Sequence, residues 1–433
     1  MKVMIVGSGG REHALAWKAA RSDRVERVLV APGNAGTALE PGVENVPIKA
    51  ADVDALVRFA REKEVGLTIV GPEDPLVKGI KDAFDGAGLS CFGPTGAAAR
   101  LEGSKAYSKE FLHRHGIPTA AYGIFRDPES ARRFIRERGA PIVVKADGLA
   151  AGKGVIVART EEEALEAAEG MLSGRAFGDA GRTVVVEDCL TGEEASFIVM
   201  VDGERILPLA TSQDHKARDD GDVGPNTGGM GAYSPAPVVT PEMDERIMAE
   251  VIEPTVRGMA EDGHPYTGFL YAGLMIGDDG VPRVLEYNCR FGDPETQPIL
   301  LRLRSDLVEL CGAALEGGLG GVRADWDARA SLGVVMAAGG YPEAYRKGDP
   351  ISGLPETEGD DLKVFHAGTE LREGRVVTAG GRVLCVTALG ATVEEAQARA
   401  YEQARRISWD GAYFRTDIGR RAVARERAPR PKA

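Results

Sequence analysis

Two lysines and three glycines lie close together between residues 145 and 154 of the sequence. Glycines in a hairpin let backbone amides close over phosphate groups, and Lys145 adds a point charge from the strand that precedes it. The segment differs from a Walker loop, because Asp147 stands at a required glycine and Gly154 at a required serine or threonine. A surface hairpin with solvated lysines is the alternative, but Lys145 follows the apolar run 142–144 and would then be a partly buried, unpaired charge.

A carboxylate and an amide stand two residues apart at Glu286 and Asn288. In a β-strand they face the same side, and Mg²⁺ prefers one or two carboxylates together with phosphate oxygens. Arg290 and Asp293 follow and could hold the carboxylate and the amine of a substrate. The alternative is an exposed polar strand face with a salt bridge. Apolar residues at 285 and 287 favour a half-buried strand, on which Glu286 needs a partner.

The glycine-rich segment Gly7–Gly10 stands between an expected strand and an expected helix, where free backbone amides attract an anion. A dinucleotide fingerprint would require glycine or alanine at Glu12 and an acid after the second strand, and neither is present. A monophosphate or sugar-phosphate site is therefore favoured over NAD, and a turn that needs glycine only for packing is an equal alternative. Glu73 follows a neighbouring strand and could bind ribose hydroxyls or cap the next helix.

A long segment, residues 211–237, is dense in glycine and proline from Gly221 onward and exceeds the usual loop length. Loops this long are usually functional or disordered. Asp214 could bind an ammonium group, and the glycine amides of Asn226–Gly229 could cover a developing oxyanion. Disorder in the absence of ligand is the alternative.

A weaker pattern covers residues 184–194. An edge strand that turns through Glu187–Leu190 could offer backbone groups to adenine, and one of the adjacent glutamates Glu193 and Glu194 could accept both ribose hydroxyls. Strand-turn-strand segments with acids are common, so the pattern alone is not specific.

The elements that must position these residues follow from hydrophobic periodicity. In the first hundred residues, short apolar runs alternate with helical patterns and end in turn clusters, which predicts a doubly wound α/β domain with a parallel sheet. A mixed unit of strands and helices follows, and the last hundred residues predict a separate α/β unit. Strands are expected at 3–6, 25–30, 67–70, 89–92, 141–146, 154–158, 183–188, 194–201, 268–276, 283–288, 330–338, 363–367 and 382–388.

Composition excludes several classes of protein. At 433 residues we expect about three domains, and 43% hydrophobic with 27% charged residues is typical of a globular protein. A net charge of −13 argues against a sequence-independent nucleic-acid binder. Five scattered cysteines without a Cys-x-x-Cys, and an apolar N-terminal run too short for a signal peptide, predict a cytoplasmic protein. The sequence contains no histidine cluster, which argues against a zinc hydrolase, and no Gly-x-Ser-x-Gly motif, which argues against a serine hydrolase.

Taken together, the motifs resemble those of the ATP-grasp superfamily and, within it, the phosphoribosylamine–glycine ligase family. The resemblance follows the order of almost the whole chain, through 7–15, 71–73, 101–105, 144–155, 192–197, 212–216, 224–235 and 285–297. It implies a doubly wound N-terminal domain (1–100), an ATP-grasp domain of two α+β lobes (101–322, small lobe about 120–188), a small C-terminal α/β domain (323–425) and a basic tail (426–433).

The resemblance also implies roles for residues of this chain, with ATP as co-substrate and Mg²⁺ or Mn²⁺ as cofactor. Lys105 and Lys145 would contact the ATP phosphates, under a hairpin that includes Gly152, Lys153 and Gly154. Glu187 and Leu190 would hold adenine, and Glu193 or Glu194 the ribose. Glu286 and Asn288 would bind the metal. The strand at 271–275 carries none of the further carboxylates common in the superfamily, which leaves a second metal's ligands open.

The implied reaction has two steps. The carboxylate of glycine would attack the γ-phosphate to give glycyl phosphate and ADP, and the amine of 5-phosphoribosylamine would then displace phosphate. Lys145, Asp214, Arg290 and Asp293 are the expected catalytic residues. Substrate contacts are expected, around glycine, from Asp214, Arg290 and Asp293; around phosphoribosylamine, from Gly9, Gly10 and Glu73; and, over both, from Asn226, Thr227, Gly228 and Gly229. We expect a cytoplasmic monomer whose partners are these small molecules, without nucleic acid or membrane.

Three other functions stay open from the sequence. A carboxylase or formate-using transformylase would keep the fold and use bicarbonate or formate, which ADP release with each candidate acid and amine distinguishes. An NAD-dependent oxidoreductase would be stabilised by NAD and not by ATP. A non-catalytic nucleotide sensor would bind ATP without turnover.

Overall fold

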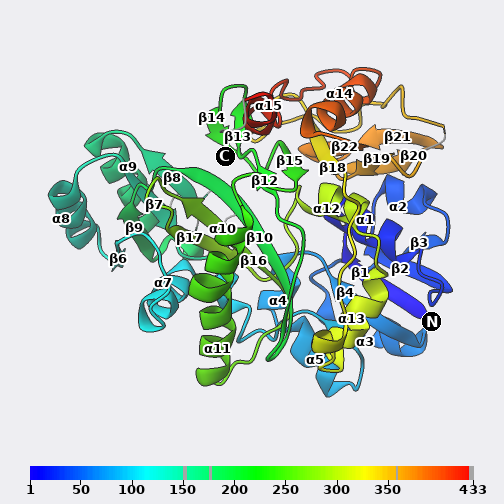
Figure 1. Ribbon diagram of the computed structural model, residues 1–433, viewed down its shortest axis with the longest axis horizontal. Coiled ribbons are helices and arrows are strands. Elements are labelled where there is room, and N and C mark those ends of the chain that lie inside the picture. The colour runs from blue at the N-terminus through cyan, green and yellow to red at the C-terminus, as the bar shows by residue number, and fades with distance from the viewer. Residues whose placement is uncertain (150–153, 175–177, 357–358, 429–433) are drawn as a thin grey trace.

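The computed structural model describes residues 1–149, 154–174, 178–356 and 359–428 (Figure 1). Gly152 and Lys153, which we predict to lie over phosphates, are outside the described residues. The chain forms mixed α/β layers. A small lobe projects at the left of Figure 1, and the N-terminal and C-terminal parts of the chain lie together at the right.

The N-terminal sheet is parallel, as predicted, with strand order β3-β2-β1-β4-β5. Alternate residues of β1 belong to two different hydrophobic clusters, because helices cover both faces of the sheet. The carboxyl ends of β1 and β4 lead into α1 and α4, so Gly9 and Glu73 lie at the same edge. The elements are β1 (Lys2–Gly7), α1 (Gly10–Ala19), β2 (Arg27–Pro32), α2 (Ala35–Leu39), β3 (Val43–Asn45), α3 (Val53–Glu62), β4 (Val65–Val70), α4 (Glu73–Val77), α5 (Ile80–Gly86) and β5 (Cys91–Phe92).

The small lobe is an antiparallel sheet of order β6-β9-β7-β8 with its own hydrophobic cluster under α8 and α9. Side-chain caps fix both helices, since Asp127 accepts from Ser130 N and Thr160 from Glu163 N. Two helices, α6 (Arg100–Gly103) and α7 (Lys105–Arg114), connect this lobe to the N-terminal sheet. The lobe comprises β6 (Tyr122–Phe125), α8 (Pro128–Arg138), β7 (Ile142–Ala146), β8 (Val155–Ala158), α9 (Glu161–Leu172), a 3₁₀ turn (Gly178–Gly181) and β9 (Val184–Asp188).

The large lobe carries a second antiparallel sheet, of order β11-β10-β16-β17. Its long central strands β10 and β16 are buried over most of their length and pair antiparallel in one register, from Glu193 opposite Ile276 to Asp202 opposite Thr267. The elements are β10 (Glu193–Asp202), β11 (Ile206–Pro208), α10 (Pro241–Ile247), a π-helical turn (Met248–Ile252), α11 (Glu253–Glu261), β16 (Thr267–Ile276), β17 (Pro282–Asn288), α12 (Thr296–Arg302), α13 (Leu307–Leu315) and a 3₁₀ turn (Leu319–Gly321).

The segment 211–237 forms four strands rather than an irregular loop, of which β12 and β15 belong to the C-terminal sheet while β13 and β14 pair with each other. Its strands β12 and β15 complete the order β12-β15-β18-β22-β19, because β15 pairs with β18 and satisfies that edge. The sheet therefore draws on more than the last hundred residues. The elements are β12 (Gln213–Asp214), β13 (Ala217–Asp219), β14 (Val223–Asn226), β15 (Gly231–Ser234), β18 (Ala330–Ala337), β19 (Leu362–His366), β20 (Thr369–Arg372), β21 (Arg375–Thr378), β22 (Arg382–Gly390), α14 (Val393–Ala404) and α15 (Arg420–Arg427).

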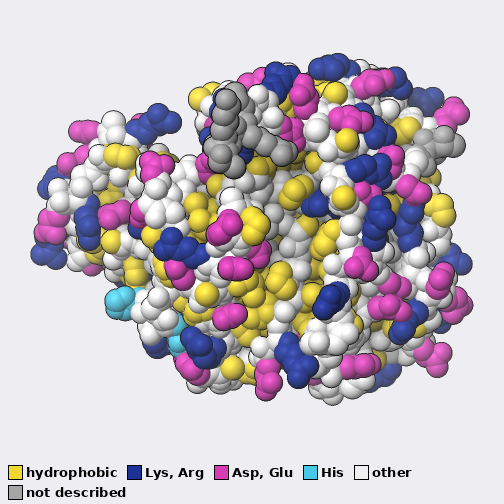
Figure 2. All heavy atoms as spheres, in the orientation of Figure 1, with side chains coloured by type: hydrophobic (Ala, Val, Ile, Leu, Met, Phe, Trp, Pro, Cys, Tyr) yellow, Lys and Arg dark blue, Asp and Glu magenta, His cyan; other side chains and the backbone are white. Residues whose placement is uncertain are grey.

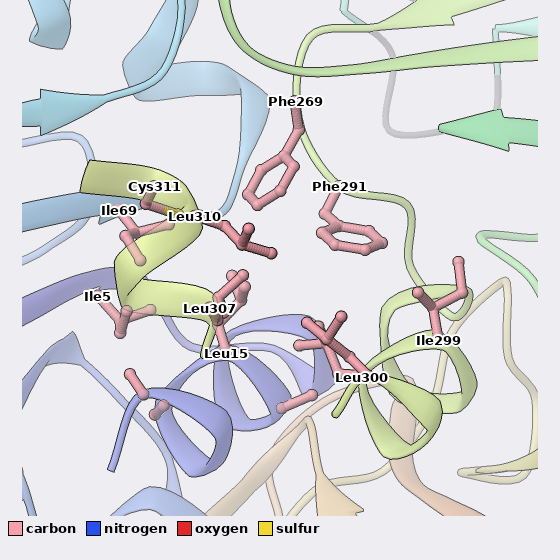
Figure 3. Packing of buried hydrophobic residues seen from close by; sticks show 14 of the residues in the cluster. Ile5, Leu15, Ile69, Phe269, Phe291, Ile299, Leu300, Leu307, Leu310 and Cys311 are labelled. Atoms are coloured by element: carbon pink, nitrogen blue, oxygen red, sulfur yellow. The ribbon is translucent and has the colours of Figure 1, made fainter. Parts of the chain in front are cut away.

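One hydrophobic cluster joins the three sheets outside the small lobe (Figure 3). Phe269 of β16 and Phe291 face each other with ring centroids 4.7 Å apart. Leu15 of α1 approaches them from one side, and α12 and α13 contribute further apolar side chains. Burial of each large apolar side chain contributes about 1.5–3 kcal/mol. The shared core holds the N-terminal sheet, the large lobe and the C-terminal sheet against one another, so loops from all three can form one site.

The outer surface mixes charges of both signs. On the face in Figure 2, acidic and basic side chains are interspersed, without a patch of one sign. Among the helices that the structure describes, none is both long and apolar enough to cross a lipid bilayer.

Candidate active site

A cavity of about 770 Å³ lies where the small lobe, the large lobe, the N-terminal sheet and the C-terminal part of the chain meet. Each of the four contributes charged or polar side chains to it. Among the residues that line it are Arg11, Glu73, Glu102, Lys105, Lys109, Lys145, Glu187, Glu194, Asp214, Lys216, Glu286, Asn288, Arg290, Asp293, Glu295, Tyr341 and Arg382.

Glu286 and Asn288, which we call the metal-type pair, both line the cavity. Asn288 stands opposite Tyr271 and Glu286 opposite Gly273, so both face the same side. Burial alone would raise the pKa of Glu286, but nearby lysines, Lys216 first, lower it to about 2. Glu286 is therefore ionised. Among the described residues no three histidines, cysteines or acids gather to hold a metal unaided, and a Mg²⁺ site that needs phosphate oxygens fits this donor set.

Lys145 has a partner within the protein. It is 5% exposed, its Nζ lies 2.5 Å from Glu187 Oε1 and donates to Leu285 O at 3.0 Å. Glu187 also forms an ion pair with Lys109, whose Nζ donates to Thr119 Oγ1. Burial would raise the pKa of Glu187, but the two lysines lower it below its ordinary value. The carboxylate of Glu187 thus holds two lysines at the cavity wall.

Lys105 begins α7, and its helix start anchors the glycine-rich hairpin. Asp147 accepts from Ser104 Oγ and from Ala106 N, both at 2.8 Å, which caps α7 from outside. The Lys105 Nζ donates to Gly148 O at 3.2 Å. Burial lowers the pKa of Lys105. The root of the hairpin is therefore fixed beside the two lysines predicted to contact phosphates.

Asp214 and Lys216 lie next to Glu286. The Lys216 Nζ is 3.5 Å from Glu286 Oε1 and 3.5 Å from Glu194 Oε2. Burial raises the pKa of Asp214 to about 8, and Glu295 and Glu194 reinforce the shift against the effect of Lys216. Asp214 is therefore neutral beside the ionised Glu286, and a cation that binds here would favour the ionised form of Asp214.

Glu194 and Glu193 point to different surroundings. Glu194 lines the cavity, whereas Glu193 is not among its lining residues and forms an ion pair with Arg425 of α15 at 2.6 Å. The geometry favours Glu194 for the ribose. The strand before them, β9, lies between β6 and β7, so the expectation of an edge strand at Glu187–Leu190 is wrong. Glu187 and Asp188 at the end of β9, and Cys189 and Leu190 of the turn after it, all line the cavity.

In the glycine loop before α1, one backbone amide is already bound by a side chain of the protein. Gly9 N donates to Glu12 Oε2 at 2.5 Å, and Arg11 pairs with Glu12 at 2.5 Å, so the helix start already carries an acid. A side chain at Gly9 would place its Cβ 2.9 Å from Glu12 Oε2 and 3.6 Å from Asp293 Oδ2. At Gly10 it would lie 2.6 Å from Gln297 Nε2. The loop thus needs glycine where it meets the segment 293–297.

Arg290 and Asp293 lie on this glycine-loop side. Arg290 is held by Glu73 at 3.3 Å and by Glu102 at 3.0 Å. Asp293 accepts from Gln297 Nε2 at 2.9 Å and from Arg382 Nη2 at 2.8 Å. Burial raises the pKa of Glu102 to about 7. The three residues predicted to bind the substrate glycine therefore lie in two places. Asp214 lies beside the metal-type pair, whereas Arg290 and Asp293 lie on the side of Glu73.

Two groups of side chains describe the cavity. The lysine group comprises Lys105, Lys145, Lys216, Glu286 and Asn288, and the arginine group comprises Arg11, Glu73, Glu102, Arg290 and Asp293. Asn226, Thr227 and Gly228 also line the cavity, and Gly229 is absent from the lining residues. Among the lining residues named above, those to which the sequence alone assigned no role are Arg11, Glu102, Lys109, Lys216, Glu295, Tyr341 and Arg382. Lys109 could have been found from its place one helical turn after Lys105, and Glu102 and Lys216 from the quoted motifs.

The chain matches three family models that together span most of its length. These are the phosphoribosylglycinamide synthetase N domain at residues 1–102, its ATP-grasp (A) domain at 103–296 and its C domain at 331–421.

Curated relatives and solved structures agree with the models. A phosphoribosylamine–glycine ligase of Vibrio vulnificus is 68% identical over 98% of this chain and 99% of its own length. One of Allochromatium vinosum is 67% identical over 99% and 100%. The crystal structure of the Thermotoga maritima phosphoribosylamine–glycine ligase covers 96% of this chain and 100% of that chain, with a TM-score of 0.84 and 35% identity. A biotin carboxylase domain from Hydrogenobacter thermophilus, 18% identical over 95% of this chain and 91% of that chain with a TM-score of 0.73, shares the fold.

Proposed function

We propose that this chain, which belongs to the phosphoribosylamine–glycine ligase family, joins glycine to 5-phosphoribosylamine with cleavage of ATP, giving glycinamide ribonucleotide, ADP and phosphate in purine biosynthesis. The observation that carries the proposal is that one cavity contains both groups of side chains. The lysine group suits a nucleoside triphosphate with a divalent cation, and the arginine group lies beside a glycine loop suited to a sugar phosphate.

The lysine group serves the first step. Lys105 and Lys145 neutralise the phosphates of ATP, and Asp147 and Gly148 hold the start of the glycine-rich segment beside Lys105. Glu286 and Asn288 hold Mg²⁺ or Mn²⁺, which supplies further neutralisation of the phosphates. Asp214 ionises to bind the ammonium of glycine, so that the carboxylate of glycine is turned toward the γ-phosphorus. Attack gives glycyl phosphate and ADP. Lys216, which lies beside Glu286, would stabilise the negative charge on the transferred phosphate.

The arginine group serves the second step. The amine of phosphoribosylamine attacks the carbonyl carbon of glycyl phosphate, phosphate leaves, and the amine loses a proton. Glu73 and Glu102 line this part of the cavity, and a pKa of about 7 for Glu102 suits proton uptake near neutral pH. Gly9 and Gly10, which lie against Asp293 and Gln297, would approach the sugar phosphate, and Asn226–Gly228, which line the cavity, would cover the reacting carbonyl.

The test is ADP release with each combination of substrates. We expect release with Mg-ATP only when glycine and phosphoribosylamine are both present, and formation of glycinamide ribonucleotide in equal amount. ADP release with bicarbonate or formate in place of glycine would contradict the proposal. Light scattering should give a monomer of 45.9 kDa, and a cytoplasmic location is expected for the same activity. Turnover measured with Mg²⁺ alone and with Mn²⁺ alone would show which of the two metals supports the reaction.

A further inference from the structure

The C-terminal part of the chain reaches into the cavity through two side chains. Arg382 is the first residue of β22, and Tyr341 lies in the turn after β18. Both line the cavity, although sequence analysis assigns no site residue beyond Asp293. Their contacts are made with segments of the large lobe and of the loop 211–237, more than 50 residues away in sequence.

Arg382 binds two of these segments at once. Its Nη1 donates to Gly228 O at 2.5 Å and to Asp293 O at 2.8 Å, with a longer contact to Gly229 O at 3.4 Å. Its Nη2 donates to Asp293 Oδ2 at 2.8 Å. A planar guanidinium can satisfy carbonyls on two loops and a carboxylate together, which a lysine ammonium cannot do with the same geometry.

Tyr341 holds the same glycine from the other side. Gly228 N donates to Tyr341 Oη at 3.0 Å, so both polar groups of that peptide segment are bound by the C-terminal part of the chain. A Cβ at Gly228 would lie 3.0 Å from Arg382 Cζ, which shows how closely the guanidinium packs on it. We call Tyr341 and Arg382 the clamp.

The clamp fixes a carboxylate on the glycine-loop side of the cavity. Both oxygens of Asp293 are bound, one by Arg382 and one by Gln297. The oxygen that Arg382 binds, Oδ2, also lies 3.6 Å from the Cβ position of Gly9. No clamp contact reaches Lys105, Lys145 or Glu286 among the hydrogen bonds described. A substitution in the clamp should therefore displace Asp293 next to Gly9 and leave the lysine group in place.

We propose that Tyr341 and Arg382 are positioning residues that hold Gly228 and Asp293 as the wall of the phosphoribosylamine subsite, so that the C-terminal part of the chain controls use of the amine substrate and not of ATP. This inference rests on the proposed function. A purely structural clamp would instead weaken all three substrates together or lower stability alone.

The first test compares Arg382→Lys and Arg382→Met by steady-state kinetics. Each leaves at least one loop carbonyl of Gly228 or Asp293 without its donor, so we expect KM for phosphoribosylamine to rise at least about tenfold. KM for ATP and for glycine should change less than about threefold. Arg375→Met, on the exposed hairpin β20–β21 of the same part of the chain, is the matched control and should match the wild type in all three.

The second test measures binding without turnover. Glycinamide ribonucleotide is a stable product that carries the sugar phosphate, so calorimetry can follow it directly. We expect Arg382→Lys to weaken its binding about tenfold while binding of a non-hydrolysable ATP analogue stays within about twofold.

Milder variants keep the test decisive if Arg382 variants do not fold. Tyr341→Phe removes the acceptor of Gly228 N, and Gly228→Ala places a Cβ 3.0 Å from Arg382 Cζ, so that the guanidinium must shift. Both should raise KM for phosphoribosylamine selectively, by a smaller factor. Equal rises for ATP and phosphoribosylamine, or unchanged KM values throughout, would overturn the clamp. A wild-type enzyme that fails to make glycinamide ribonucleotide would overturn the proposed function instead, so the two failures are distinguishable.

Discussion

The two halves of the cavity are assembled in different ways. The lysine group comes from one stretch, residues 105–288, and its members stand on a helix start, on strands or directly beside a strand. The arginine group comes from residues 11, 73, 102, 290 and 293, and most of these lie in or beside loops at the ends of strands. Arg382, which binds Asp293, is more distant still in sequence.

The difference extends to charge. In the arginine group the charges pair within the protein, as Arg290 does with Glu73 and Glu102. In and around the lysine group, the charges of the ligand-free protein are less well matched. The neighbouring Asp214 has a pKa raised to about 8, and Lys216 stands 3.5 Å from each of two carboxylates. We infer that binding at the lysine group changes the protonation of Asp214, while in the arginine group proton uptake is expected from Glu102 and binding depends on shape and on hydrogen bonds.

The largest effect should come from Glu286→Ala. It removes the one carboxylate of the metal-type pair, so we expect kcat to fall at least about 10³-fold with cooperative unfolding retained. Glu286→Gln should lose nearly as much, because the amide keeps the shape and not the charge. Binding of Mn²⁺ in the presence of an ATP analogue, followed by electron paramagnetic resonance, checks the cause independently of turnover. Near-normal activity or unchanged Mn²⁺ binding would refute the metal assignment.

The next effect concerns the arginine group. Gly9→Val places side-chain carbon against Glu12 and toward Asp293 in a backbone conformation (φ −88°) that valine can adopt. The substitution should therefore act by filling space, and we expect KM for phosphoribosylamine to rise about 100-fold while KM for ATP rises less than about threefold. Gly86→Ala, where an added Cβ meets nothing within 4 Å, is the control. Equal rises for both substrates would contradict a separate sugar-phosphate subsite.

The lysine group was largely predictable from sequence for a physical reason. A two-residue spacing on a strand fixes the face of Glu286 and Asn288, and an apolar run before Lys145 implies burial that demands a partner. The parallel N-terminal sheet followed in the same way from buried, branched runs. Local patterns suffice where one element carries the chemistry.

The arginine group was less predictable because its geometry is set by contacts between distant segments. Nothing local to Asp293 indicates that its carboxylate binds Arg382, and no periodicity places the loop 211–237 in a sheet with β18. The prediction of an edge strand at β9 is wrong because the neighbouring strand β6 was not among the strands expected from sequence. Pairing of distant strands and long loops is decided by tertiary contacts, which sequence spacing alone does not encode.

Asp214 gives the lysine group a pH dependence. With burial raising its pKa to about 8, Asp214 is mainly protonated at pH 7 and must ionise to bind the ammonium of glycine. The apparent affinity for glycine should thus rise with pH, by up to about tenfold per unit between pH 6 and 8, and level off above. Asp214→Asn should abolish this slope and raise KM for glycine about tenfold or more. A flat profile in the wild type would contradict the assignment.

The same pKa predicts a stability effect of definite sign. The ordinary pKa of an aspartate is 3.8, so between about pH 4 and pH 8 the folded, ligand-free protein binds this proton and the unfolded chain does not. Stability from this group therefore falls as pH rises through that window. The Tm of Asp214→Asn should exceed that of the wild type by a margin that grows from pH 5 to pH 8. A constant margin would show that Asp214 does not titrate in this range.

The smallest effect separates two neighbouring carboxylates at the edge of the lysine group. Glu194 lines the cavity and Glu193 pairs with Arg425, with both partners of that pair about a third to a half exposed. Glu194→Gln should raise KM for ATP about fivefold, because a charged acceptor for the ribose hydroxyls becomes neutral. Glu193→Gln breaks only an exposed ion pair, which contributes less than about 1 kcal/mol to stability, and should leave KM for ATP within about twofold. A larger effect from Glu193 would assign the ribose to it and would mean that α15 moves away when nucleotide binds.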